Sequence, residues 1–397
     1  MRRELNPDLP AHVSRLGTVP ALDGLRALAV LSVFAVHLDW TVSGHGVTVF
    51  FALSGFLITA LLLEEKDQNG RVAMGRFFAR RGLRLLPALL VFLVADVAYT
   101  MATRADAASR GNHLKQVAAT LLYANNWLIG LRQVPDDHLS HTWSLAVEEQ
   151  FYIVWPFALL AILALAHCRK RSAAWVALLA LSFTGERYLL AGIFPHERAL
   201  EYRIYNGTDA RLDALLYGAA AAFAFRDRLF LTGWGAGALA WLAAVLLVAH
   251  LFGNVGAEPR SLSPTSLAAY LGVALATTAL VYALALRRPE LKPLEWLLTL
   301  APVRYLGRVS YGLYLWHPLA CVVAKEQFPN LDGVSAVALK ILGAMVPTML
   351  SYHLVEKPCL RWKGRFAPPA RAAAPAAPGT VPLAAAAAVG SRPSGPG

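Results

Sequence analysis

The chain has 397 residues, of which 57% are hydrophobic and 16% are charged, and its formal net charge is +12. This composition, with a mean hydropathy of +0.47, excludes an ordinary soluble enzyme and indicates an all-α polytopic membrane bundle. Membrane topology and contact with anionic lipid headgroups account for the positive charge, so we expect no nucleic-acid partner.

Apolar segments follow one another through most of the chain. A transmembrane helix needs roughly 20 apolar residues, so we predict about ten transmembrane helices in the lipid bilayer. The segments are 21–41, 47–63, 84–102, 145–167, 173–192, 210–226, 232–252, 265–286, 308–325 and 334–356.

Lys and Arg gather in alternate connections between these segments, as they do in cytoplasmic loops. Examples are residues 66–84, residues 169–171 and residues 287–308. The pattern predicts that both termini lie in the cytoplasm. Frequent Ala, Arg and Pro are typical of a high-GC bacterium, so we expect a multi-pass protein of a bacterial plasma membrane.

The ends of the chain differ from its centre. Residues 1–20 are polar and are predicted to form a cytoplasmic leader, and residues 21–360 form the membrane domain. Residues 368–397 are nearly all Ala, Pro, Gly and Ser and cannot bury enough apolar surface to offset their chain entropy. We therefore predict a disordered cytoplasmic tail over 361–397.

The first apolar segment carries Arg26 and His37 on one helical stripe. Eleven residues close to within roughly 20° of three full turns and rise about 16 Å, so both side chains face one direction at different depths. An ionisable group inside a membrane costs on the order of 3 kcal/mol and persists mainly where it lines a cavity or has a partner. This stripe is therefore the first candidate site, although an isolated histidine of this kind also serves in packing.

Six stretches of the chain, taken in order, resemble the integral-membrane acyltransferase-3 family. They are LDGLRALAV (22–30) with His37 after it, FFALSGFLI (50–58), RRGLRLLP (80–87), TWSLAVEEQFY (142–152), TDARLDALLYG (208–218) and SYGLYLWHP (310–318). The resemblance covers residues 18–360. It implies transfer of an acetyl or other short acyl group to a hydroxyl, with acyl-CoA as a co-substrate and no permanently bound cofactor.

The resemblance assigns catalysis to the first stripe. A neutral His37 imidazole can take the proton of an acceptor hydroxyl as that hydroxyl attacks the thioester, and an acyl-enzyme on His37 is the alternative. Arg26 is expected to assist it and to contact the incoming donor.

Glu148 is the second catalytic candidate. It shares a helical face with Ser144 and Trp155, and Glu149 points about 100° away. A buried carboxylate must be paired or protonated, so Glu148 either orients His37 and holds the acceptor or forms a structural pair with Arg211 or Arg26.

Substrate-binding roles are expected near the starts of two segments. Ser144 and Trp143 are candidates, although an interfacial belt is the more common place for such a tryptophan. Tyr311, Tyr314 and His317 form a predicted pocket wall, which Pro318 can kink.

Arg81 and Arg84 lie on one face at the start of the third segment. Two guanidinium groups in this arrangement suit phosphates, so they are candidates for binding the nucleotide of acyl-CoA with Arg26. The alternative is a topology signal that binds lipid headgroups.

No metal site is predicted. His138 and His141 lie beside Asp136 and Asp137, but this spacing in a loop is unspecific. Glycine-rich phosphate loops, G-x-S-x-G and H-E-x-x-H are missing from the sequence, so a serine hydrolase or a metalloprotease is not supported.

The acceptor is left open between a cell-envelope polysaccharide and a glycosylated metabolite such as a macrolide antibiotic. The sequence has no long extracytoplasmic segment of the kind that some envelope-modifying members carry, which favours the metabolite. A transporter or flippase of a sugar-containing or lipid substrate is the competing class, for which internal repetition would be expected. The oligomeric state is not predicted.

Overall fold

The computed structural model describes residues 16–38, 40, 42, 45–194, 197–227, 234–253 and 261–366. Every regular element in these residues is helical, which confirms the all-α class. The predicted leader before residue 16 and the predicted tail from residue 367 lie outside the described residues. Residues 357–366 form two short helices, α15 (Lys357–Trp362) and η4 (Lys363–Phe366).

The long helices coincide with the ten predicted segments. They are α1 (Ala21–His37), α2 (Gly46–Asn69), α3 (Met74–Thr103), α6 (Trp143–Ala166), α7 (Arg169–Ile193), α9 (Thr208–Arg226), α10 (Trp234–Phe252), α11 (Pro264–Ala285), α13 (Ala301–Gln327) and α14 (Gly333–Ser351). Within the described residues, seven helical spans are long and apolar enough to cross a membrane. The chain is thus a multi-pass membrane protein, whereas the count of ten and the orientation stay predictions.

Three of the ten long helices, α1, α9 and α13, are not among the seven apolar spans. Helix α1 has only 17 residues, and α9 and α13 carry charged and polar side chains in their length. These helices bury most of their apolar residues inside the bundle. They are therefore interior helices for much of their length.

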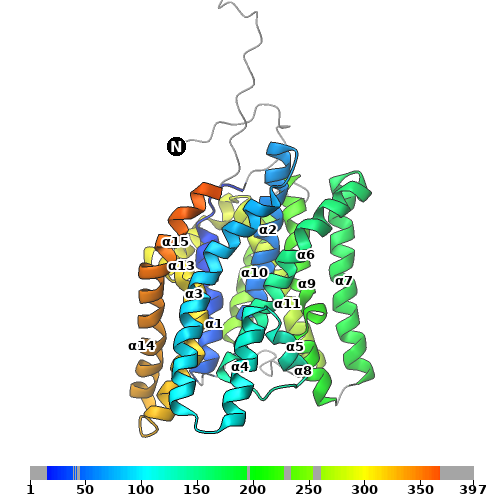
Figure 1. Ribbon diagram of the computed structural model, residues 1–397. Helices are drawn as coiled ribbons and strands as arrows, with labels where there is room; N and C mark the ends of the chain where they lie inside the picture. Colours follow the sequence, from blue (N-terminus) through cyan, green and yellow to red (C-terminus); the bar gives the residue numbers. More distant parts are fainter. Residues whose placement is uncertain are drawn as a thin grey trace, which may run out of the picture.

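Figure 1 shows the long helices upright and side by side, with shorter helices gathered at the lower end. These are α4 (Ala107–Leu121), α5 (Asn125–Gly130) and α8 (Arg198–Asn206). Tyr123, with a φ of 52°, lies in the break between α4 and α5. The elements η1 (His138–Thr142), η2 (Pro289–Leu291), α12 (Lys292–Leu298) and η3 (Tyr352–Glu356) complete the fold.

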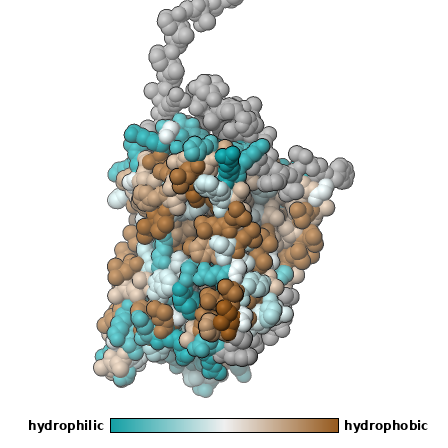
Figure 2. Space-filling model, turned by 90° about the vertical axis from the view of Figure 1, so that its right-hand side faces the viewer, coloured by the Kyte–Doolittle hydropathy of each residue, from teal (hydrophilic) through white to brown (hydrophobic). Residues whose placement is uncertain are grey.

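The outer surface is apolar around the middle of the bundle. Val94 is 71% exposed, Leu178 63% and Val245 61%. Figure 2 shows brown, hydrophobic residues over much of one face and hydrophilic residues at its two ends. Such a surface is stable in a lipid bilayer and not in water.

Two close helix crossings position the interior helices. A Cβ atom added at Gly307 of α13 would lie 1.8 Å from the carbonyl oxygen of Asp23 on α1. One added at Gly55 of α2 would lie 1.8 Å from the carbonyl oxygen of Leu215 on α9. Because only glycine fits at such contacts, Gly307 fixes how closely α1 and α13 approach each other.

Candidate active site

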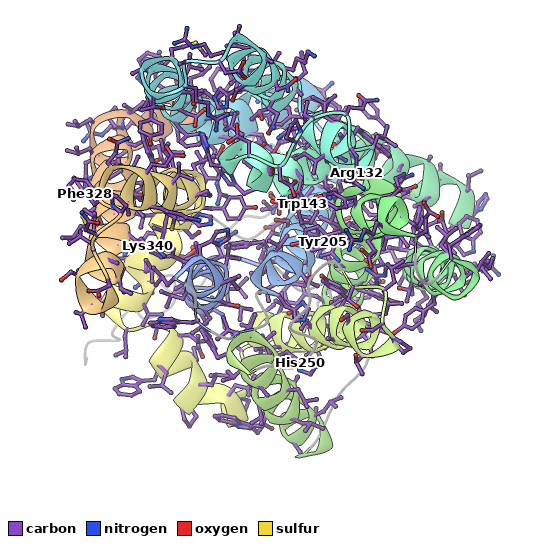
Figure 3. All side chains as sticks on the ribbon, turned by 90° about the horizontal axis from the view of Figure 1, so that it is seen from below. Arg132, Trp143, Tyr205, His250, Phe328 and Lys340 are labelled. Atoms are coloured by element: carbon purple, nitrogen blue, oxygen red, sulfur yellow. The ribbon has the colours of Figure 1, made fainter. Side chains whose placement is uncertain are left out.

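A cavity of about 1510 Å³ lies at the lower end of the bundle, where η1 and the connection between α13 and α14 meet α1. Its wall includes His37, His141, His317 and Tyr314, and we call it the histidine cavity. In the view from below, Trp143 and Tyr205 lie near the middle of the bundle and Lys340 lies on α14 (Figure 3). All three of these residues also line the cavity.

His37 ends α1 and is exposed in this wall. Its Nδ1 lies 3.0 Å from the carbonyl oxygen of Val33. Because a carbonyl only accepts, Nδ1 carries the proton, and Nε2 is the basic nitrogen of the neutral ring. The ring centroid of His37 lies 4.7 Å from that of His317. The predicted base therefore has the right tautomer and faces a second imidazole.

His317 is held by a backbone carbonyl that Pro318 leaves without its usual helical hydrogen bond. Pro318 lies inside α13 and has no N–H to donate to the carbonyl of Tyr314, one turn earlier. That carbonyl instead accepts from His317 Nδ1 at 2.8 Å. Nε2 of His317 is buried without a hydrogen-bond partner, so it is available to a ligand in the cavity.

Ser144 on α6 contacts Tyr314 on α13, as expected if both residues belong to one pocket wall. The Tyr314 hydroxyl donates to the carbonyl of His141 at 2.7 Å, so the Ser144 hydroxyl, also at 2.7 Å, donates to Tyr314. His141 Nδ1 lies 2.6 Å from the carbonyl of His138, and its Nε2 is buried and unpartnered. His141 was not among the predicted site residues, although it directly precedes the 142–152 stretch.

Trp143 is only 5% exposed, so placing it in an interfacial belt is wrong. Its ring lies 4.9 Å from Tyr205 and 5.9 Å from Phe51. A wall position in the cavity agrees with the predicted substrate-binding role. Tyr311 differs, because its hydroxyl donates to the carbonyl of Leu85 on α3 at 3.2 Å and it is not among the residues that line the cavity.

Arg26, Arg81 and Arg84 form a second group, which we call the arginine cluster. Arg81 donates to Glu149 at 2.9 Å, and its guanidinium lies 3.3 Å above the centre of the Tyr152 ring. Arg26 pairs with Asp23 at 3.0 Å.

Arg84 is exposed. The described residues show no hydrogen bond or ion pair from its guanidinium, but the charges of Arg26, Arg81 and Glu148 act on it. It is the arginine of the cluster that is available to an anion.

Glu148 belongs with the arginine cluster and not with the histidine cavity. It accepts from Ser54 at 2.8 Å and is not among the residues that line the cavity. Pairing with Arg211, one of the structural alternatives, is not seen, because Arg211 donates to Thr48 at 3.1 Å and lies over Tyr270. The contacts of the described residues thus give no support to a Glu148 that orients His37.

Comparison with known proteins shows the family to which the chain belongs. A family model described as an acyltransferase domain matches residues 19–353, so the chain belongs to this acyltransferase family. It is 31% identical over 368 residues to a Bacillus subtilis protein named "Putative peptidoglycan O-acetyltransferase YrhL", covering 86% of this chain and 54% of that protein. It is 30% identical over 373 residues to "Peptidoglycan O-acetyltransferase OatA" of Listeria monocytogenes, covering 86% and 55%.

The chain therefore spans a little over half the length of these curated relatives. No solved structure matches it significantly.

Proposed function

We propose that the chain transfers an acetyl group from acetyl-CoA to a hydroxyl of a cell-envelope glycan. The observation that carries the proposal is His37, whose Nδ1–H is bonded to a backbone carbonyl and which lines a cavity large enough for a sugar. Membership of an acyltransferase family and relatives named for peptidoglycan O-acetylation support the reaction and the acceptor class.

In this reaction, Nε2 of His37 takes the proton of the acceptor hydroxyl as its oxygen attacks the thioester carbonyl. The carbon–sulfur bond then breaks, and the CoA thiolate recovers the proton from the imidazolium. Nε2 of His317 and of His141, both unpartnered, can accept hydrogen bonds from other hydroxyls of the sugar. This would set which hydroxyl reaches His37.

The arginine cluster is proposed as the donor site. Arg84 offers a guanidinium for the phosphates of CoA, and Arg26 lies on the helix that leads from there to His37. Arg26 and His37 are about 16 Å apart along α1, a distance that the extended arm of CoA can cover. Glu148, held by Ser54, offsets part of the positive charge.

Binding of cytoplasmic acetyl-CoA requires the arginine cluster to lie at the cytoplasmic side of the membrane. We therefore also propose ten spans with both termini in the cytoplasm. A cysteine-free protein tests it, with Arg71→Cys or Ala108→Cys added. An impermeant maleimide applied to intact cells should label position 108 and not position 71. The reverse pattern would contradict the orientation.

The reaction itself is tested with purified protein in nanodiscs and acetyl-labelled acetyl-CoA. Label should pass to soluble peptidoglycan fragments in the wild type and not in His37→Ala. Label on a macrolide alone would move the acceptor to the glycosylated metabolites, the class that the sequence favoured. An intact thioester with every acceptor would overturn the proposal and return a transporter to consideration.

A further inference from the structure

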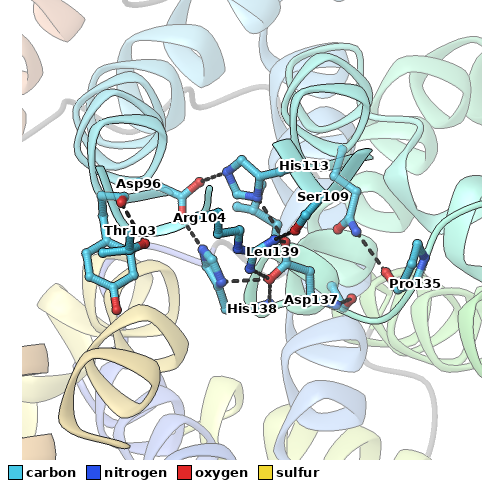
Figure 4. Close-up of polar contacts among 12 residues, drawn as sticks. Asp96, Thr103, Arg104, Ser109, His113, Pro135, Asp137, His138 and Leu139 are labelled. Carbon is cyan, nitrogen blue, oxygen red and sulfur yellow. Dashed lines mark hydrogen bonds and ion pairs between the residues drawn. The ribbon is translucent and has the colours of Figure 1, made fainter. Parts of the chain in front are cut away.

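A closed cluster of ionisable side chains lies beside the histidine cavity and takes no part in the reaction above. Asp96 comes from α3, His113 from α4 and His138 from η1 (Figure 4). The side chains of Asp96 and His113 are 0% exposed and that of His138 is 1% exposed. Asp137 lies against both imidazoles and is held by Arg104.

The two imidazoles bridge the two carboxylates. Nε2 of His113 lies 2.8 Å and Nε2 of His138 2.5 Å from the oxygens of Asp96. On the other side, Nδ1 of His113 lies 2.9 Å and Nδ1 of His138 2.7 Å from Asp137. Both Nε2 atoms therefore converge on Asp96, while both Nδ1 atoms face Asp137.

Two of these four contacts are hydrogen bonds, from His113 Nδ1 to Asp137 and from His138 Nε2 to Asp96. An ionised carboxylate only accepts hydrogen bonds, so these two bonds take one N–H from each ring and leave both imidazoles neutral. A divalent cation between Asp96 and the two Nε2 atoms would balance the carboxylate charge and also leave both rings neutral. The other ring nitrogens, His113 Nε2 and His138 Nδ1, and the Oδ2 atom of Asp96 have no hydrogen bond of suitable geometry, although all three are buried.

We propose that Asp96, His113 and His138 bind a divalent transition-metal ion such as zinc. Their ligand atoms all lie within 4.8 Å of one another. Tetrahedral zinc holds its ligand atoms about 3.3 Å apart, so the carboxylate and rings need to separate by less than about 1 Å. Two imidazoles and a carboxylate are a donor set that zinc and iron both accept, with water in the remaining position.

In such a site, Asp137 would orient the two metal-binding histidines by accepting hydrogen bonds from their Nδ1 atoms. It accepts from the Nδ1 of His113 at 2.9 Å and lies against that of His138, which favours the tautomer that presents Nε2 to the metal. Arg104 donates to both of its oxygens, at 2.9 and 2.6 Å.

The metal would join three segments that are far apart in the chain. His138 is in η1, which also carries His141, and both residues line the histidine cavity. Fixing η1 to α3 and α4 would therefore fix one wall of the cavity. The site does not depend on the proposed reaction, because its ligands lie outside the proposed catalytic groups.

Metal content tests the proposal directly. Wild-type protein purified from zinc-supplemented cells should hold about one metal ion per chain by inductively coupled plasma mass spectrometry. His113→Ala and His138→Ala should hold almost none, while His167→Ala, which changes an exposed histidine, should match the wild type. A wild type with no more metal than His113→Ala, and no uptake when zinc chloride is titrated in, would overturn the proposal.

Two further measurements serve if the alanine variants fold poorly. Asp137→Asn keeps all three ligands and should bind zinc 10–100-fold more weakly. A chelator should lower the Tm of the wild type, and added zinc should restore it. A Tm that responds to neither would overturn the proposal and favour a metal-free cluster held by hydrogen bonds.

Discussion

The histidine cavity and the arginine cluster share helix α1 but are built differently. In the cavity, backbone carbonyls bind the Nδ1–H of His37, His141 and His317, which leaves each Nε2 as a base or acceptor. In the arginine cluster, carboxylates bind two of the guanidinium groups and leave Arg84 available. A backbone carbonyl fixes the tautomer of an imidazole without adding charge, whereas a carboxylate neutralises the charge of a guanidinium group. The first arrangement suits proton transfer and the second suits anion binding.

The largest expected effect is at the base. His37→Ala should lower kcat about 10²–10⁴-fold, because general-base catalysis contributes that much, with the Tm of the protein unchanged. Acetyl transfer in nanodiscs measures it, and His167→Ala provides the matched histidine control. Normal turnover in a folded His37→Ala protein would remove the cavity from the mechanism.

Arg81 should matter mainly for stability. Arg81→Gln leaves Glu149, 13% exposed, without its cation, which should cost on the order of 3 kcal/mol. Thermal unfolding measures it, and the Arg81→Gln/Glu149→Gln double variant should recover most of the loss. A raised KM for acetyl-CoA at unchanged Tm would show instead that Arg81 binds the donor.

Arg84 should matter mainly for the donor. Arg84→Gln should raise the KM for acetyl-CoA about 10–100-fold, because hydrogen bonds to charged groups are worth about 1.5–3 kcal/mol, and should leave the Tm unchanged. Arg76→Gln on the same helix is the control for a topology signal. An equal rise in the KM for the acceptor would count against donor binding at the arginine cluster.

The smallest effect should separate two tyrosines of α13. Tyr314→Phe removes the hydrogen bond to the carbonyl of His141, worth about 1 kcal/mol, and should raise the KM for the acceptor several-fold. Tyr311→Phe removes a bond of the same kind to Leu85 outside the cavity and should leave that KM unchanged. Equal changes in both variants would mean that Tyr314 acts only through stability.

Much of this arrangement could be predicted from local sequence. The stripe of Arg26 and His37 on α1 and the different directions of Glu148 and Glu149 follow from helical periodicity. The structure agrees, since Glu148 meets Ser54 and Glu149 meets Arg81. The partner of Asp213 could not be predicted from local spacing, because it is Arg187 on α7, a different helix.

The sequence by itself determined the helices and the face on which each polar residue lies, because both depend on the local backbone repeat. Only the tertiary structure decided which faces meet. It separated Glu148 from His37, brought His141 to His317 and placed Asp96 between His113 and His138. These contacts depend on how each helix is rotated and how closely it packs, and Gly307 against α1 shows that a single missing side chain can set that distance.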